Sequence, residues 1–168
     1  KRDAALSEYL LQSQLKNVQI NLQEQSNFQE GSACILYIQI WYREKGNVFS
    51  VPLAEVERYL CETLSDELNR LFTSAVMFQL EPGRFAAQVN LLGSSSRISG
   101  YMRKFMKRLE EEQDFACFIV VQSEELSDEV DLADVYNQLQ DAVRQALVCN
   151  HSQLITLPLS GDAAQAFT

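Results

Sequence analysis

The order of apolar and polar residues along the chain follows two periods. Segments with an apolar residue at every third or fourth position are typical of helices that pack on one face, and short continuous apolar runs are typical of buried strands. A helix is expected over 5–22, with its apolar positions at Leu6, Leu10, Leu11, Leu15 and Val18. Later helices are expected from Pro52 onward, after Ser94–Ser96 and over 131–147, and strands over 34–40, 75–80, 85–92, 115–121 and 153–157.

The second and third expected strands are joined by a short turn. Residues 81–84 read Glu-Pro-Gly-Arg, and a Pro-Gly turn between two strand-like runs predicts a β-hairpin. The order after residue 33 is then β-α-β-β-α-β-α-β. This order predicts an α/β (α+β) fold, with a mixed sheet of about five strands and helices on one or both faces.

The chain divides into three expected parts. Residues 1–32 form a leading helix and a connection, residues 33–158 form the main domain, and residues 159–168 begin a linker. The leading helix has three interpretations that the pattern does not separate: an inter-domain helix, a dimer seam, or an extra helix packed on the same core.

Several residues are expected to mark helix ends. Pro52 suits the first turn of its helix, and the serines at 94–96 offer an N-cap to the next one. Asp131 stands near a helix start, where a negative charge complements the helix dipole, and Asn150 could end that helix in a left-handed cap.

The composition is that of an ordinary globular domain. The 168 residues are 46% apolar and 22% charged, so we expect a proper core and little disorder. The net charge of −9 argues against direct nucleic-acid binding by this segment. Its apolar runs are far shorter than the roughly 20 residues of a membrane span, so no membrane contact is expected. The chain begins at Lys1 without a signal peptide, so we expect other domains of the same chain as partners.

The four cysteines predict a reducing compartment. Cys34, Cys61, Cys117 and Cys149 form no C-x-x-C pair, and two of them, Cys34 and Cys117, lie inside strand-like runs. A thiol in such a run behaves as a small apolar side chain. We therefore expect buried thiols rather than disulfides or metal ligands, and a cytoplasmic location.

No recognisable catalytic set is present. The single histidine, His151, cannot form a two-histidine metal site, and it is expected on the surface between a helix and a strand. Neither of the common glycine-rich phosphate loops occurs. The remaining candidates are acidic runs, a basic helix side and aromatic residues after the first strand. They are Glu110–Glu112 with Asp114; Glu124, Glu125, Asp128, Glu129 and Asp131; Arg97, Arg103, Lys104, Lys107 and Arg108; and Trp41, Tyr42 and Phe49.

These candidates have plain structural interpretations beside the functional ones. The acidic runs lack the spacing of a calcium-binding loop and are expected to be solvated loops or helix ends. The basic side could meet an acidic partner or a phosphate ligand, but Glu110–Glu112 offer it local ion pairs. The aromatic residues could line a pocket or belong to the core or its rim.

Over about residues 33–158 the order of elements resembles the GGDEF domain of bacterial diguanylate cyclases. The residues that carry the resemblance are the first strand, 35–41, the hairpin, 81–86, and the last helix and strand, 132–155. Phe85 and Ala86 occupy the places of the phenylalanine and the following small residue of the family motif. The resemblance implies a nucleotide-cyclase fold with the motif on the hairpin.

The motif itself departs from the family pattern. The resemblance implies two metal ions held by an aspartate of the first strand and by an acidic hairpin residue, where this chain has Gln39 and Gly83-Arg84. Glu81-Pro82 replaces the pair of glycines, and the product-binding R-x-x-D would fall at 72–75, which does not match. We therefore expect no enzyme but a catalytically inactive cyclase-like domain, with no catalytic residue, no metal and no cofactor.

Domains of this degenerate type are similar to the middle segment of AraC-type bacterial transcription regulators. The resemblance implies a regulatory, signal-transmitting domain that acts through a homodimer or through a small effector or nucleotide. The alternatives are an active nucleotide-binding or nucleotidyl-transferring enzyme with atypical ligands, and a purely structural dimerisation module.

Overall fold

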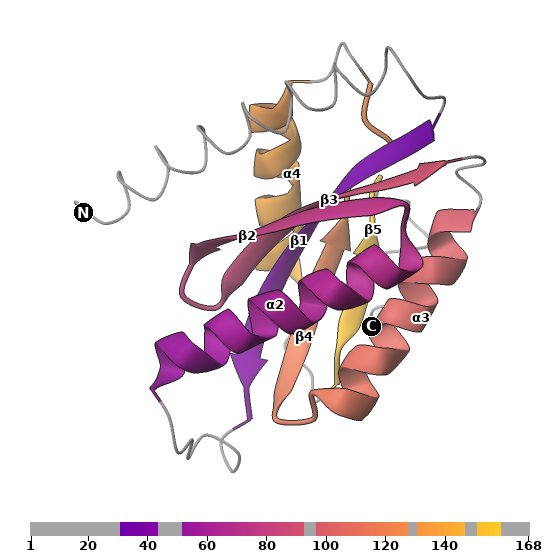
Figure 1. Ribbon diagram of the computed structural model, residues 1–168. Coiled ribbons are helices and arrows are strands. Elements are labelled where there is room, and N and C mark those ends of the chain that lie inside the picture. The colour runs from indigo at the N-terminus through magenta and orange to yellow at the C-terminus, as the bar shows by residue number, and fades with distance from the viewer. Residues whose placement is uncertain (1–30, 44–51, 93–96, 128–130, 147–150, 159–168) are drawn as a thin grey trace.

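Five strands form one mixed sheet with helices on both of its faces (Figure 1). The computed structural model describes residues 31–43, 52–92, 97–127, 131–146 and 151–158. In chain order the elements are β1 (Gly31–Tyr42), α2 (Leu53–Leu71), β2 (Ser74–Glu81), β3 (Arg84–Leu92), α3 (Ile98–Glu112), β4 (Ala116–Gln122), α4 (Leu132–Gln145) and β5 (Gln153–Thr156). The predicted order and the mixed five-stranded sheet are confirmed. The helix expected over 5–22 and the linker over 159–168 lie outside the described residues.

The strand order in the sheet is β2-β3-β1-β4-β5. β1 pairs antiparallel with β3 and with β4, β2 and β3 form the predicted antiparallel hairpin, and β4 pairs in parallel with β5. β1 is therefore the central strand. Its residues from Ala33 to Ile38 are all buried, because helices cover both of its faces. This explains why β1 has a continuous apolar run rather than an alternating one.

Two apolar cores lie on opposite faces of the sheet. α2 and α3 cover one face, and α4 covers the other. The first core includes Leu36, Ile38, Leu60, Leu64, Leu68, Phe85, Met102, Phe105 and Phe118. The second core includes Ile35, Tyr37, Ile119, Val121, Leu132 and Leu139. On α2, Leu53 at the first position is 45% exposed, whereas Leu60, Leu64 and Leu68 are buried against the sheet.

Helix ends agree only in part with the sequence signals. Asp131 is the N-cap of α4, where its Oδ1 accepts a hydrogen bond of 2.9 Å from the backbone N–H of Ala133. Pro52 is the N-cap of α2 rather than a residue of its first turn. The N-cap position of α3 belongs to Arg97, which makes no side-chain capping bond. The serines at 94–96 and Asn150 lie outside the described residues.

The described cysteines are free thiols. Cys34 and Cys117 are buried, as expected, and Cys61 is half-buried. Burial raises the pKa of Cys34 to about 12, with a smaller contribution from the negative charge of Glu125. Cys34 is therefore an uncharged, unreactive thiol near neutral pH. Cys149 lies outside the described residues.

None of the helices in the described part of the chain has both the length and the apolar character that crossing a bilayer requires.

The side chain of Asn69 on α2 covers part of the free edge of β2. Its Nδ2 donates to the carbonyl oxygen of Ala75 at 3.1 Å, and its Oδ1 accepts from the N–H of Ala75 at 2.9 Å. The amide thus imitates a neighbouring strand at a sheet edge, where unpaired backbone groups favour aggregation.

Replacing Asn69 with alanine is expected to lower the free energy of unfolding by about 1 kcal/mol, because both hydrogen bonds to β2 are lost. Urea denaturation of the purified chain measures this change. The exposed neighbour Asp66 offers a control, and Asp66→Ala should change stability by less than about 0.5 kcal/mol. Equal effects of the two substitutions would mean that the bonds of Asn69 do not stabilise the edge.

Candidate functional site

The turn of the β2–β3 hairpin lies beside the end of β1. In the strand register Gln39 of β1 faces Arg84 of β3, and Glu81 of β2 also faces Arg84. The N–H of Ile40 donates to the carbonyl oxygen of Gly83 at 2.8 Å. The structure thus brings Gln39 to the hairpin residues 81–84, which is the set that the sequence singled out.

Gly83 has a backbone conformation that requires glycine. Its φ of +78° lies in the left-handed region, which strains any residue with a Cβ. Space is not the constraint, since an added Cβ would meet the Ile40 oxygen at 3.7 Å and the Gln39 Nε2 at 3.9 Å, which are ordinary contacts. A register shift between Gln79 and Glu81 completes the irregular end of the hairpin.

The carboxylate of Glu57 on α2 accepts hydrogen bonds from β1, from β2 and from the turn of the hairpin. Its Oε1 accepts from the backbone N–H of Gly83 at 2.9 Å and from Nε2 of Gln79 at 2.6 Å. Its Oε2 accepts from the hydroxyl of Tyr42 at 2.7 Å. The residue is only 3% exposed. Glu57 therefore fastens the hairpin turn and the end of β1 to the start of α2, and we call this set the Glu57 cluster.

Tyr42 is held as a hydrogen-bond donor in the Glu57 cluster. Burial raises its pKa, and the hydrogen bond to Glu57 and the negative charge of that carboxylate raise it further. Its ring stacks on Phe115, with ring centroids 6.4 Å apart and an angle of 14° between the planes. The hydroxyl therefore keeps its proton at neutral pH and remains available to Glu57.

A second polar group lies on the α4 side of the same turn. Arg84 donates through Nε to Oε1 of Gln39 at 2.8 Å, and it forms an ion pair with Glu81. The Arg84 and Glu81 side chains are 37% and 35% exposed, so water screens this pair and it adds little stability. Burial raises the pKa of the neighbouring Tyr37, and the positive charge of Arg84 opposes that shift without reversing it.

The two sides of the turn differ in what they can bind. The Glu57 side is buried, and its carboxylate is already engaged by donors of the same chain. The Arg84 side reaches solvent and offers a guanidinium beside an amide, a combination that suits an anionic group. Among the residues that the structure describes, no group of three or more His, Cys, Asp or Glu side chains is arranged to hold a metal ion.

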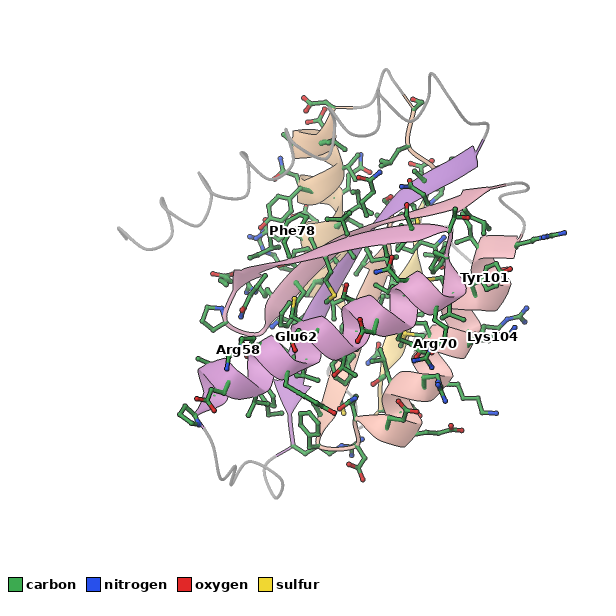
Figure 2. The ribbon with its side chains drawn as sticks, viewed as in Figure 1. Arg58, Glu62, Arg70, Phe78, Tyr101 and Lys104 are labelled. Carbon is green, nitrogen blue, oxygen red and sulfur yellow. The ribbon has the colours of Figure 1, made fainter. Side chains whose placement is uncertain are left out.

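The basic residues of α3 are mostly occupied locally. Arg108 pairs with Glu67 of α2 and with Glu112, each at 3.1 Å, and Lys107 lies 3.9 Å from Glu111. These ion pairs raise the pKa of Arg108. The Nζ of Lys104 lies 5.7 Å from the ring centre of Tyr101. Lys104, Lys107 and Arg108 therefore each interact with a residue of the same chain. Figure 2 shows Lys104 and Tyr101 on α3 beside Arg70 at the end of α2.

The other predicted residues are scattered. His151 is exposed before β5, which agrees with a surface histidine, and Trp41 is 45% exposed at the end of β1. Glu110 accepts from the N–H of Ser152 at 2.9 Å. Phe72, at the place of the family's product-binding motif, is buried against Tyr101. The remaining candidates Phe49, Asp128 and Glu129 lie outside the described residues.

Glu57 is not among the candidate functional residues that the sequence predicts. Its position contained a signal, since Glu57 stands three residues before Leu60 and seven before Leu64, on the apolar stripe of the helix. The same holds for Glu67, which is 9% exposed and pairs with two arginines. An acidic residue within an apolar stripe indicates a buried, hydrogen-bonded carboxylate.

This arrangement defines a class of domain: an α+β fold with a central strand, a two-stranded hairpin beside it and the polar turn of that hairpin at one end of the sheet. No family model matches the chain, and no curated protein matches it. The structure is similar to the active GGEEF domain of a diguanylate cyclase from Vibrio cholerae, with a TM-score of 0.56 and 12% identity over 85% of this chain and 92% of that one. It is also similar to the GGDEF domain of DgcB from Caulobacter crescentus, solved in complex with c-di-GMP, with a TM-score of 0.52 and 7% identity over 75% of this chain and 78% of that one.

The chain therefore has the fold of GGDEF domains. The expectation that it is not an enzyme is wrong, because the fold is that of cyclase enzymes and one of the similar domains is described as active. The expectation rested on substitutions at the motif positions, among them Gln39, Gly83 and Arg84. Those substitutions change single side chains, whereas the sheet, the helices and the hairpin of a cyclase are all retained.

Proposed function

We propose that this domain transmits a signal within a larger, cytoplasmic bacterial regulator of the AraC type. The observation that carries the proposal is the Glu57 cluster, in which one buried carboxylate joins α2, the hairpin turn and the end of β1. Hydrogen bonds that share one acceptor depend on one another, so a shift of any one element changes the bonds of the other two. An input at the turn is thus passed to α2.

The exposed side of the turn supports an effector as the input. Arg84 can exchange its ion pair with Glu81 for a pair with a phosphate or carboxylate of a small effector or nucleotide, because that pair is exposed and weak. A homodimer contact at the same place would act in the same way. The net charge of −9 suits a regulator whose DNA-binding part is a separate domain.

The proposal is tested in the full-length gene product with Glu57→Gln. Glutamine keeps the shape of the side chain but removes its charge, so the three donors are held less firmly. We expect a changed transcriptional output in a reporter strain at unchanged protein level. The matched control is Glu55→Gln in the exposed first turn of α2, which should leave the output unchanged. Unchanged output in both variants, or a full-length product without a DNA-binding region, would overturn the proposal.

A second function, the condensation of two GTP molecules into a cyclic dinucleotide with release of two pyrophosphates, is favoured by the fold of the similar solved domains. It predicts that the chain converts GTP with Mg²⁺ into a cyclic dinucleotide above the level of a protein-free control, as measured by chromatography. Product at the level of that control would remove this function. The two functions are compatible, because a cyclase can also pass on a conformational change.

A further inference from the structure

The two faces of the sheet are covered unequally by the described helices. α2 and α3 lie side by side on one face, whereas α4 alone lies on the other, over β1 and β4 (Figure 1). Packed helices are about 8–10 Å apart and strands about 4.8 Å apart, so one helix covers about two strands. The five-stranded sheet has room for two helices on each face. On the side of α4, the strands β2 and β3 are the part left without a described helix.

An apolar strip marks this part of the sheet. Successive residues of a strand point to opposite faces, and Val76, Phe78 and Leu80 of β2 share the face of α4. We call these three residues the hairpin strip. Val76 is 52% exposed, and Phe78 and Leu80 are only partly buried at the margin of the second core. Figure 2 shows Phe78 on the side of the hairpin away from α2.

The neighbouring positions of β3 on this face, Ala86 and Gln88, are each only 2% exposed, so the accessible part of the face is β2. Phe78 faces Ala86 in the register, so its larger side chain stands above a small one at the margin of the sheet. Val76 faces Gln88, whose amide Nε2 is already satisfied by Asn90 at 3.2 Å. A partly exposed apolar strip on an edge strand is a site for association, because water contact with it is unfavourable.

The chain contains a segment of matching length and pattern. Residues 5–22 have the period of an amphipathic helix, with Leu11 and Val18 on its apolar side. A helix over this range would be about 27 Å long at 1.5 Å per residue. The eight residues of β2 extend over about 26 Å at about 3.3 Å per residue. One such helix therefore covers the whole hairpin strip.

The connection is long enough to bring this segment to the strip. β1 begins at Gly31, which faces Leu92 of β3, so the chain enters the sheet one strand away from β3 and two from β2. Two strand spacings amount to about 10 Å. Residues 23–30 can extend over roughly 26 Å. The tether also gives the segment a high effective concentration at the strip, which favours it over an untethered partner.

We propose that residues 5–22 dock as an amphipathic helix on the hairpin strip and form the second helix on the face of α4. The inference stands without the proposed regulatory function. Such docking would couple the leading segment to the hairpin, because displacing the segment removes contacts from β2 and β2 leads directly into the turn at Gly83.

The test is the reactivity of a thiol placed on the strip of the complete chain. Val76→Cys introduces the thiol, iodoacetamide alkylates it, and mass spectrometry of the peptide that contains residue 76 separates it from the native cysteines. We expect this thiol to react about tenfold more slowly than in the chain unfolded by urea. Adding Leu11→Asp and Val18→Asp should raise its rate about tenfold, because charges on the apolar side release the helix.

The matched control moves both charges by one residue, to Gln12→Asp and Gln19→Asp on the polar side of the same helix. This control should keep the slow rate, and circular dichroism should show the same folded sheet in all variants. The proposal is overturned if the introduced thiol already reacts at the unfolded rate, or if the Leu11 and Val18 substitutions leave its rate unchanged. A rate that rises on dilution would assign the strip to a second copy of the chain, which also overturns it.

Discussion

Replacing Glu57 with alanine is expected to lower the free energy of unfolding by about 3 kcal/mol, measured by urea denaturation. The carboxylate is the acceptor for the N–H of Gly83, the amide of Gln79 and the hydroxyl of Tyr42. The Gly83 contact is buried, so its N–H loses a partner that water does not readily replace. For a chain of this length, the melting temperature should fall by about 6–12 °C.

Two comparisons distinguish the loss of the Glu57 hydrogen bonds from the general effect of removing an acidic residue from α2. Glu55→Ala removes an exposed acidic residue from the same helix and should cost less than about 0.5 kcal/mol. Tyr42→Phe removes one donor only. In the double variant, the cost of losing Tyr42 should shrink once Glu57 is absent, since the two residues form a coupled pair. Additive costs for the two substitutions would contradict the cluster as a cooperative unit.

Replacing Phe85 with alanine is expected to cost about 4 kcal/mol, the largest effect of any substitution considered. Phe85 is the second residue of β3, directly after the turn, and it is completely buried in the core beneath α2 and α3. In the register it faces Ile38 of β1 and Gln79 of β2. Its removal leaves a cavity at the point where the hairpin joins the central strand.

The effect of Phe85→Ala is measured by urea denaturation together with Phe85→Leu. Leucine keeps most of the apolar volume, so its cost should stay near or below about 1.5 kcal/mol. If the free energy of unfolding of the alanine variant falls by less than about 1 kcal/mol, the ring of Phe85 does not stabilise the packing at this point. The resemblance to the GGDEF motif at this residue is thus explained by packing, independently of any chemistry at the turn.

The sequence predicts the elements of this fold well because most of its signals are local. The strand expected over 115–121 is observed as β4 over Ala116–Gln122, and the turn expected at residues 81–84 joins β2 and β3 as predicted. Asp131 caps α4 because its side chain acts on a backbone group two residues away. Such features require only neighbouring residues, so a single sequence contains them.

Features that depend on distant residues were not accessible in the same way. The three donors to Glu57 lie 15, 22 and 26 positions away along the chain, and only the folded hairpin brings them together. The position of β1 between β3 and β4 likewise depends on pairings between remote segments. The mistaken inference about enzymatic activity had a related cause, since motif positions were judged one by one while the fold is a property of the whole sheet.

The exposed side chain of Trp41 at the end of β1 makes the fluorescence of the protein sensitive to this region. Trp41 is the only tryptophan in the chain, and it follows Gln39 by two residues, next to the strand end that contacts Gly83. Its emission therefore comes from a single place beside the hairpin turn, and at 45% exposure it is open to a dissolved quencher. The unlabelled protein thus contains its own fluorescent probe for ligand binding or movement at this end of the sheet.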